Sequence, residues 1–194
     1  MSDTASKLST FAQIRALPHK PSLAISALLL ERMYPSYALF SELCDFGDKT
    51  VVRNQLALVW EAVSAPKLKI NLEVQSEKLE LVTPDVADFD NFGVFPALDF
   101  CMALNVALQQ IAGEVSDAAV TIAKLSQGSV EAYIQASEGD ELQGAELRKH
   151  PLMQFEIESQ LEALALCQQK PIPVEQLKAY VAQLEVSNLG ISLA

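Results

Sequence analysis

The sequence predicts an all-α protein, organised as a single-domain helical bundle of about seven or eight helices. The composition favours helix, because the chain is rich in alanine, leucine, glutamate and glutamine and has only 7 glycines among 194 residues. Apolar residues recur three and four positions apart along most of the chain, and capping residues or prolines stand where these patterns begin and end. We therefore expect residues 1–194 to form one domain, with residues 1–6 disordered.

Prolines divide the first third of the chain into predicted helices. A first helix should end before Pro18, and an almost entirely apolar second helix should end at Pro35. A short helix follows, and Asp48 is well placed to cap the next one, which Pro66 ends. The first three of these helices are expected at residues 7–17, 22–34 and 36–43.

Residues 67–75 are ambiguous, because polar and apolar residues alternate there with the period of a strand. A strand needs a partner, and no second segment alternates as clearly. We therefore expect a helix that Asn71 caps and that extends to about Val82.

Glycine and serine mark the helix ends in the rest of the chain. Gly113 should end one helix, Ser116 should cap the next, and Gly128-Ser129 should kink it. The expected ranges are 96–112, 116–137, 151–169 and a last helix from 174, with one helical turn within 141–149 and a loop-like tail at 187–191. The helices at 22–34 and 96–112 are the most apolar and should be the most buried.

The formal net charge of −11 excludes two classes of partner. Without a basic face the protein cannot offset repulsion by phosphates, so neither nucleic acid nor a membrane is an expected partner. Residues 1–10 lack the apolar stretch of a signal peptide, and the longest apolar run, 23–30, is too short to span a bilayer. We therefore expect a cytoplasmic protein. Its three cysteines, Cys44, Cys101 and Cys167, should be reduced core residues.

The sequence lacks the motifs of the common chemistries. His19 and His150 have no cysteine or histidine at ligand spacing, so no zinc site is predicted. No glycine-rich loop precedes a helix, and no serine stands in a Gly-x-Ser-x-Gly turn. A cysteine nucleophile stays open only if the fold brings Cys44 or Cys101 to His19. We therefore predict no catalytic residue, no metal and no cofactor.

The segment 83–102 departs most from what a plain helical core requires. Four aspartates and four phenylalanines alternate in it: Asp85, Asp88, Asp90, Asp99, Phe89, Phe92, Phe95 and Phe100. The first three aspartates could hold a hard cation, but the other ligand positions of an EF-hand are missing, so turns and helix capping explain them more simply. The phenylalanines should anchor the segment to the core, and a ligand cage is the alternative.

Asp99 is the one charge on an otherwise apolar face, in the first turn of its helix. The helix dipole favours an anion there, so capping, or a buried pair with an arginine such as Arg32, is expected. Glu31 and Arg32 lie near the end of a buried helix, where they either pair with nearby groups or form a site at the mouth of the core. If a ligand site exists, its candidate residues are Glu31, Arg32, Tyr34, Asp90 and Asp99.

Several short motifs, taken in order, resemble one known family. They are Glu31-Arg32-Met33-Tyr34-Pro35, Phe46-Gly47-Asp48, Trp60-Glu61, Asp88-Phe89-Asp90, Gly93-Val94, Pro96-Ala97 with Asp99, and Ser187-Asn188-Leu189-Gly190-Ile191. This order and spacing resemble the YjaG-like family of bacterial proteins, a domain of unknown function. The resemblance implies a compact all-helical domain from a bacterial cytoplasm and supplies no catalytic residues. Its members often have tyrosine where this chain has Phe92 and Phe95, which favours a packing role for this segment.

Two functions of different kinds compete. A mean hydropathy of +0.18 with only 20% charged residues suggests more apolar surface than a monomer hides. The leading expectation is therefore a non-enzymatic interaction protein, which binds another protein or forms a homo-oligomer. The alternative is a small-molecule-binding protein or enzyme with a carboxylate and arginine site at residues 83–100. A closed pocket with convergent polar groups would favour this alternative.

Overall fold

The computed structural model describes residues 9–65, 67–139, 142–184 and 186–192, and within them the predicted all-α bundle is confirmed. Those residues form nine α-helices, one 3-10 helix and no strand beyond an isolated bridge between Val186 and Ser192. The elements are α1 (Thr10–Arg15), α2 (His19–Cys44), α3 (Lys49–Ser64), α4 (Leu72–Glu80), η1 (Val86–Asp88), α5 (Val94–Ala112), α6 (Ala118–Glu138), α7 (Gly144–Lys149), α8 (Pro151–Cys167) and α9 (Val174–Ala182). The expected disorder of residues 1–6 and the role of Pro66 lie outside the described residues.

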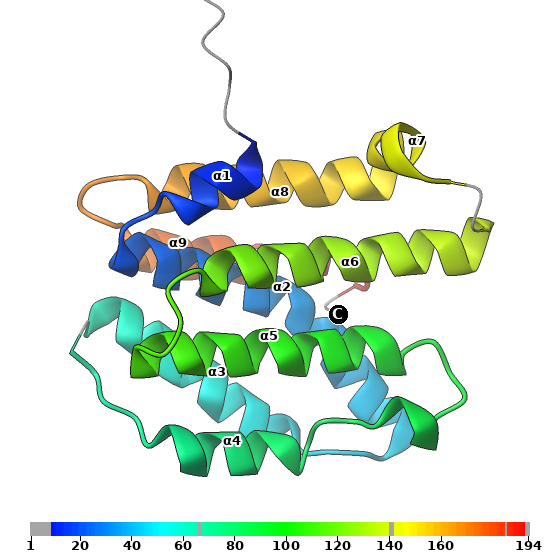
Figure 1. The fold of residues 1–194 in the computed structure, drawn as a ribbon, viewed down its shortest axis with the longest axis horizontal. Helices are drawn as coiled ribbons and strands as arrows, with labels where there is room; N and C mark the ends of the chain where they lie inside the picture. The colour runs from blue at the N-terminus through cyan, green and yellow to red at the C-terminus, as the bar shows by residue number, and fades with distance from the viewer. Residues whose placement is uncertain (1–8, 66, 140–141, 185, 193–194) are drawn as a thin grey trace, which may run out of the picture.

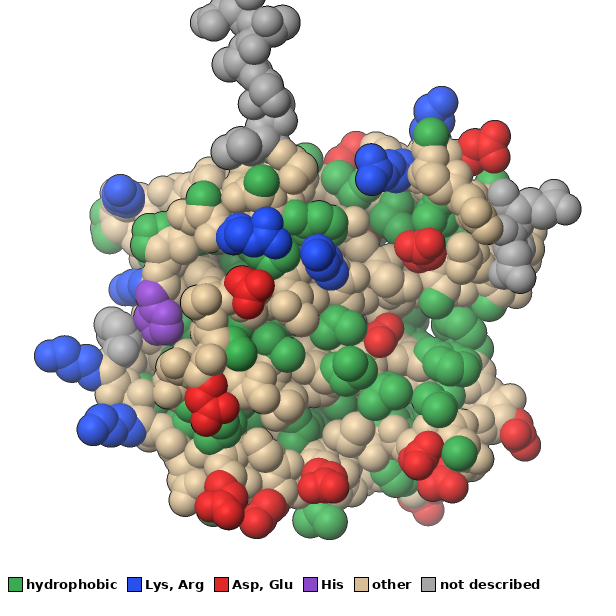
Figure 2. All heavy atoms as spheres, viewed as in Figure 1, with side chains coloured by type: hydrophobic (Ala, Val, Ile, Leu, Met, Phe, Trp, Pro, Cys, Tyr) green, Lys and Arg blue, Asp and Glu red, His purple; other side chains and the backbone are tan. Residues whose placement is uncertain are grey.

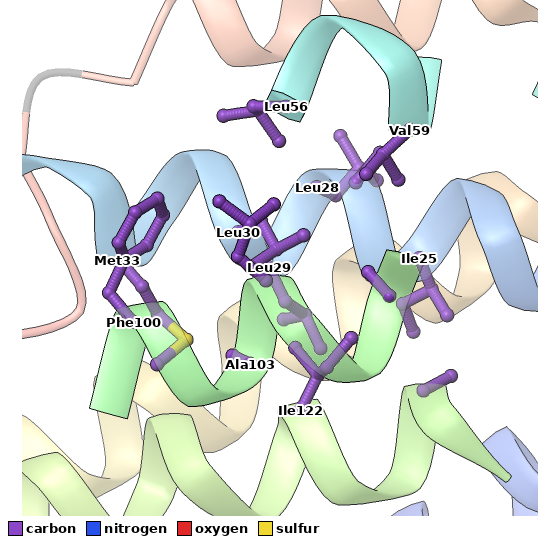
Figure 3. Close-up of a cluster of buried hydrophobic side chains, with 14 of the residues drawn as sticks. Ile25, Leu28, Leu29, Leu30, Met33, Leu56, Val59, Phe100, Ala103 and Ile122 are labelled. Atoms are coloured by element: carbon purple, nitrogen blue, oxygen red, sulfur yellow. The ribbon is translucent and has the colours of Figure 1, made fainter. Parts of the chain in front are cut away.

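Helix α2 is the centre of the bundle. Figure 1 shows α8, α6, α5 and α4 as roughly parallel rods from top to bottom, with α2 crossing behind them. Side chains of α2 reach Leu56 and Val59 of α3 on one side, and Phe100 and Ala103 of α5 and Ile122 of α6 on the other (Figure 3). A helix with neighbours on every side has to be apolar all round, which is the pattern that the sequence shows for α2.

Proline does not end this helix, contrary to the prediction. The segments expected at 22–34 and 36–43 are one helix of 26 residues that continues through Pro35. A proline inside a helix forfeits one hydrogen bond and costs about 3 kcal/mol. Here Pro35, Tyr37 and Phe40 are all buried, so core packing offsets that cost. The helix ends instead where Asp45 adopts a left-handed conformation with φ of 49°.

Most other helix boundaries follow from local capping. Asp48 accepts a hydrogen bond from the Thr50 backbone N–H at 2.7 Å, and Asn71 accepts one from that of Val74 at 3.2 Å. The ambiguous residues 67–75 thus lead into α4, as expected. Helix α6 begins after Asp117 rather than Ser116, and it continues through Gly128 without a break.

Helix α5 is both a core helix and a surface helix. Its 19 residues are apolar enough to cross a membrane by length and composition, but 56% of the apolar window is buried within the bundle, as in the core helix of a soluble protein. It packs against α2, α3, α4 and α6. Its outer face leaves two large apolar side chains half exposed, Phe95 at 50% and Met102 at 48%.

The three cysteines are free, and their environments differ. Burial raises the pKa of the Cys101 and Cys167 thiols to about 12, whereas Cys44 is half-buried and accepts a hydrogen bond from Asn91 Nδ2 at 3.3 Å.

A thiol reagent should therefore label Cys44 in the native protein, because the thiolate is the reactive form. Cys101 and Cys167 should label only on unfolding, as mass spectrometry of the modified peptides would show. Rapid native labelling of Cys101 would contradict this.

Candidate functional site

The structure distributes the five predicted site residues over separate places. Arg32 is inside the core, Glu31 and Tyr34 lie on a surface between α2, α3 and α9, and Asp99 lies between α5 and α6. Asp90 is exposed in the segment before α5. The predicted contact between Asp99 and Arg32 does not form. Arg32 instead reaches Glu156 of α8, and Asp99 is bonded by Ser129 of α6.

Arg32 forms a buried ion pair with a residue that the sequence analysis missed. Its Nη2 donates to Glu156 Oε2 of α8 at 2.8 Å, and the two side chains are 1% and 0% exposed. Ser126 Oγ and Gln160 Nε2 both donate to Glu156 Oε1 at 2.7 Å. Glu156 shares a buried helix face with Met153 and Gln160. A carboxylate on such a face needs a partner, so this position could have been recognised in the sequence, although the identity of the partner could not.

The chain end completes this buried network. The tail at 187–191 has no helix, as expected, but it is part of the core. Asn188 is 1% exposed, its backbone N–H donates to the Arg32 carbonyl at 3.2 Å, and its Nδ2 donates to Ser126 Oγ at 3.2 Å. The network therefore joins α2, α6, α8 and the tail inside the core.

Glu31 is held by two donors at the surface. Arg53 Nη1 donates to its Oε2 at 2.6 Å, and Trp60 Nε1 donates to its Oε1 at 3.0 Å. The Arg53 guanidinium stacks on Tyr34, 3.8 Å from the ring centroid. Glu31 lines two open cavities, of about 630 and 510 Å³. Both carboxylate oxygens are already bonded, so this cluster matches the expected pairing with nearby groups better than a free binding site.

Asp99 has a different environment. Ser129 Oγ of α6 donates to its Oδ2 at 2.6 Å, and its Oδ1 has no hydrogen-bond partner among the described residues. Burial raises the pKa of the Asp99 carboxyl, and the hydrogen bond from Ser129 opposes this in part. The side chain is thus a partly desolvated carboxylate with one oxygen left to bind something else.

Asp99 lines an open groove between α5 and α6, which we call the Asp99 groove. Its volume is about 770 Å³, and its lining residues are Phe92, Phe95, Leu98, Asp99, Thr121, Lys124, Leu125, Gly128, Ala132, Gln135 and Ala136. The charges at the groove are Asp99 and Lys124, and Lys124 Nζ lies over the Phe11 ring, 5.9 Å from its centroid. Figure 2 shows hydrophobic side chains gathered over this part of α5 and α6.

The phenylalanines before α5 divide between two roles. Phe89 packs against Phe40 and Phe46, with ring centroids 4.9 and 5.3 Å apart, so it anchors the segment to the core as expected. Phe92 instead contacts Phe95 and Tyr133, at 5.9 and 5.8 Å, and forms the end of the Asp99 groove. Only part of this segment therefore has the predicted packing role.

The acidic residues before α5 are not gathered into one site. Asp85 caps η1 by accepting a hydrogen bond from the Ala87 backbone N–H at 2.9 Å, which is the kind of role expected for these aspartates. Asp88 and Asp90 are exposed. Within the described residues no group of three His, Cys, Asp or Glu side chains is arranged to hold a metal ion.

Comparison with known proteins gives the family. The model of the family described as "Protein of unknown function (DUF416)" matches residues 9–192. This chain belongs to the DUF416 family. One DUF416 relative, "Uncharacterized protein YjaG" of Escherichia coli (strain K12), is 36% identical over 170 residues, 85% of this chain and 87% of the relative. Another, an "Uncharacterized protein" of Haemophilus influenzae, is 37% identical over 87% of this chain and 89% of its own.

A solved DUF416 structure has the same fold. The crystal structure of a DUF416 family protein from Shewanella baltica OS155 matches with a TM-score of 0.88 and 35% identity, and the match covers 96% of this chain and all of that one. The predicted resemblance is therefore confirmed, and the family is one of unknown function. The DUF416 comparisons assign no role to the Asp99 groove, so any role has to be argued from its geometry.

The raised pKa of Asp99 predicts how stability depends on pH. The folded state holds the Asp99 proton more tightly than the unfolded state, so stability falls as pH rises through the window above about 4, the unfolded pKa. Asp99→Asn keeps an acceptor for Ser129 and removes the charge. It should raise the free energy of unfolding at pH 7 by about 0.5–2 kcal/mol, because the folded protein then no longer holds a partly desolvated charge.

Urea melts at pH 7 and pH 4 measure this effect, and the gain from Asp99→Asn should shrink at pH 4. Asp99→Ala is the control, because it also removes the acceptor for Ser129 and should be less stable than Asp99→Asn by about 1 kcal/mol. An Asp99→Asn protein clearly less stable than wild type at pH 7 would show that the carboxylate stabilises the fold.

Proposed function

We propose that this protein is a non-enzymatic binding protein of the bacterial cytoplasm, and that a helix of another protein docks in its Asp99 groove. The observation that carries the proposal is an open groove of about 770 Å³ whose walls are mostly apolar, with Phe95 half exposed at its edge. Apolar grooves of this kind, rimmed by polar groups, commonly mark sites of protein association.

The shape of the groove favours a helix as its occupant. The α6 residues that line it run from Thr121 to Ala136, which corresponds to about 22 Å, or four helical turns. Its floor includes Gly128, Ala132 and Ala136, four residues apart, so a second helix backbone can approach closely. No heavy atom lies within 4 Å of where a Gly128 Cβ would stand, which leaves this space to the occupant.

Other occupants fit less well. A second copy of the chain brings another net charge of −11, so charge repulsion opposes a homo-oligomer. The alternative of a small-molecule site with a carboxylate and an arginine loses support because Arg32 is paired with Glu156 and no arginine is among the described residues that line the groove. The separate cavities at Glu31 are open, and Arg53 and Trp60 already bond that carboxylate.

Site-specific crosslinking in living bacteria tests the proposal. A photoreactive benzoylphenylalanine replaces Gln135 in the groove or, as a control, the exposed Gln176 of α9. We expect the groove position alone to crosslink a different protein, which mass spectrometry identifies. That protein, once purified, should bind wild type and Gly128→Ala alike but Gly128→Leu about tenfold more weakly, because leucine fills the groove. Crosslinking to a second copy, or equal crosslinking from both positions, would contradict the proposal.

A further inference from the structure

The Asp99 groove combines an apolar floor with one carboxylate, and only one of the two carboxylate oxygens accepts a hydrogen bond from a described residue. Asp99 Oδ2 is bonded by Ser129, whereas Oδ1 has no partner among the described residues and lies where the groove lining is apolar. A cationic group brought to Oδ1 would form a charge-assisted hydrogen bond there. Lys124 does not fill this role, since its ammonium group lies over Phe11 of α1.

The exposed charges of α4 and of the segment before α5 are mostly negative, like Asp99. From α4 to the segment before α5, residues 72–90 expose six carboxylates and contain one lysine, Lys78. The six are Glu73, Glu77, Glu80, Asp85, Asp88 and Asp90. Figure 2 shows acidic side chains along this lower edge, beside the apolar surface of α5 and α6, and basic side chains mainly at the left and top. Helix α4 packs on α5, which lies between α4 and α6, so the α4 part of this acidic edge is one helix away from the groove (Figure 1).

We infer that the helix that docks in the Asp99 groove is basic and amphipathic, with an apolar face on the α6 floor and a lysine or arginine at Asp99. This inference rests on the proposed function and adds the chemistry of the partner. The net charge of −11 and the acidic edge attract such a helix to this face of the protein, while Asp99 and the apolar floor hold it in the groove. An acidic helix with the same apolar face would be repelled by both Asp99 and the edge.

Three labelled peptides of roughly 18 residues, about five helical turns, test this by fluorescence anisotropy. The first has a leucine face and a lysine face, the second replaces its lysines with glutamates, and the third has the first peptide's composition in an order without an apolar face. We expect the first to bind at least about tenfold more tightly than either of the others. Asp99→Asn should weaken its binding about three- to tenfold, with Asp90→Asn as a control of smaller effect.

Gly128→Leu and Gly128→Ala test whether helices bind in the groove at all, separately from whether basic helices bind better. Gly128→Leu should abolish tight binding of the lysine amphipathic peptide, and Gly128→Ala should leave it within about twofold. If the lysine and glutamate peptides both bind and both are lost in Gly128→Leu, the groove binds helices without preference for charge. The inference is then wrong and the proposed function stands. The groove is not a helix-docking site if the binding of no peptide is weakened by Gly128→Leu. The same conclusion follows if the third peptide, which has no apolar face, binds as tightly as the first.

Discussion

Arg32→Ala should lower the free energy of unfolding by about 3–5 kcal/mol, because it leaves the Glu156 carboxylate buried without its counter-charge. The two side chains are 1% and 0% exposed, and their contact is 2.8 Å. The loss is a large part of the 5–15 kcal/mol that stabilises a typical domain. Urea melts followed by circular dichroism would measure it.

Arg53→Ala is the matched control, since it removes the same side chain from another ion pair at 2.6 Å. The Arg53 side chain is 46% exposed, so solvent screens this pair and the loss should stay within about 1 kcal/mol. Equal losses in the two arginine variants would mean that burial does not govern the strength of these pairs here.

Replacement of both Arg32 and Glu156 is expected to recover much of the stability that Arg32→Ala loses. Arg32 Nε and Asn188 Oδ1 are buried without a hydrogen-bond partner among the described residues, so the network is incompletely satisfied. An Arg32→Met, Glu156→Leu double variant removes both charges together, as in buried pairs that apolar residues replace at little cost. It should be more stable than Arg32→Ala. A double variant less stable than Arg32→Ala would show that the remaining polar groups depend on the pair.

Gly47→Ala should lower the free energy of unfolding by about 2–4 kcal/mol, through two effects. Gly47 has a φ of +76°, a conformation that costs an alanine about 1–2 kcal/mol. The added Cβ would also overlap the Tyr37 hydroxyl, which donates to the Val82 carbonyl at 2.9 Å. Tyr37 is fully buried and cannot move aside, so that hydrogen bond is lost or strained, at about 1–2 kcal/mol.

Gly113→Ala isolates the backbone effect. Gly113 has a similar φ of +82°, but no heavy atom lies within 4 Å of an added Cβ. Thermal or urea melts should therefore show a loss of only about 1–2 kcal/mol for Gly113→Ala. If both glycine variants lose the same amount, the contact with Tyr37 contributes nothing.

Helix positions were largely predictable because their causes are local. Asp48 and Asn71 cap the helices that follow them, as their side chains and positions predict. Gly113 ends α5 with a left-handed φ, which glycine adopts at low cost. The α2 prediction failed at Pro35, because a local rule was outweighed by the burial of Tyr37 and Phe40 beyond it.

The candidate site was less predictable, because contacts between charges depend on helix packing. Asp99 was found from its position on an apolar face, and it does lie in a groove, but it is in the second turn of α5 because the helix begins at Val94 and not at the predicted residue 96. Its partner, Ser129, is 30 residues away on α6, and Arg32 meets Glu156 across 124 residues of sequence. Neither pairing leaves a periodic signal, so the sequence identified residues in unusual environments but not their partners.

The sequence by itself determined that this protein is an all-α domain of the DUF416 family with an acidic, apolar-rich chain. Helical periodicity, caps and composition act over a few residues, so they can be read along the chain. Only the tertiary structure decided which polar residues are buried together and which surface stays open. The packing of α5 on α6 leaves the Asp99 groove uncovered, and the packing of α2 on α8 closes around Arg32 and Glu156. The physical reason is that side chains distant in sequence meet only once the helices have docked.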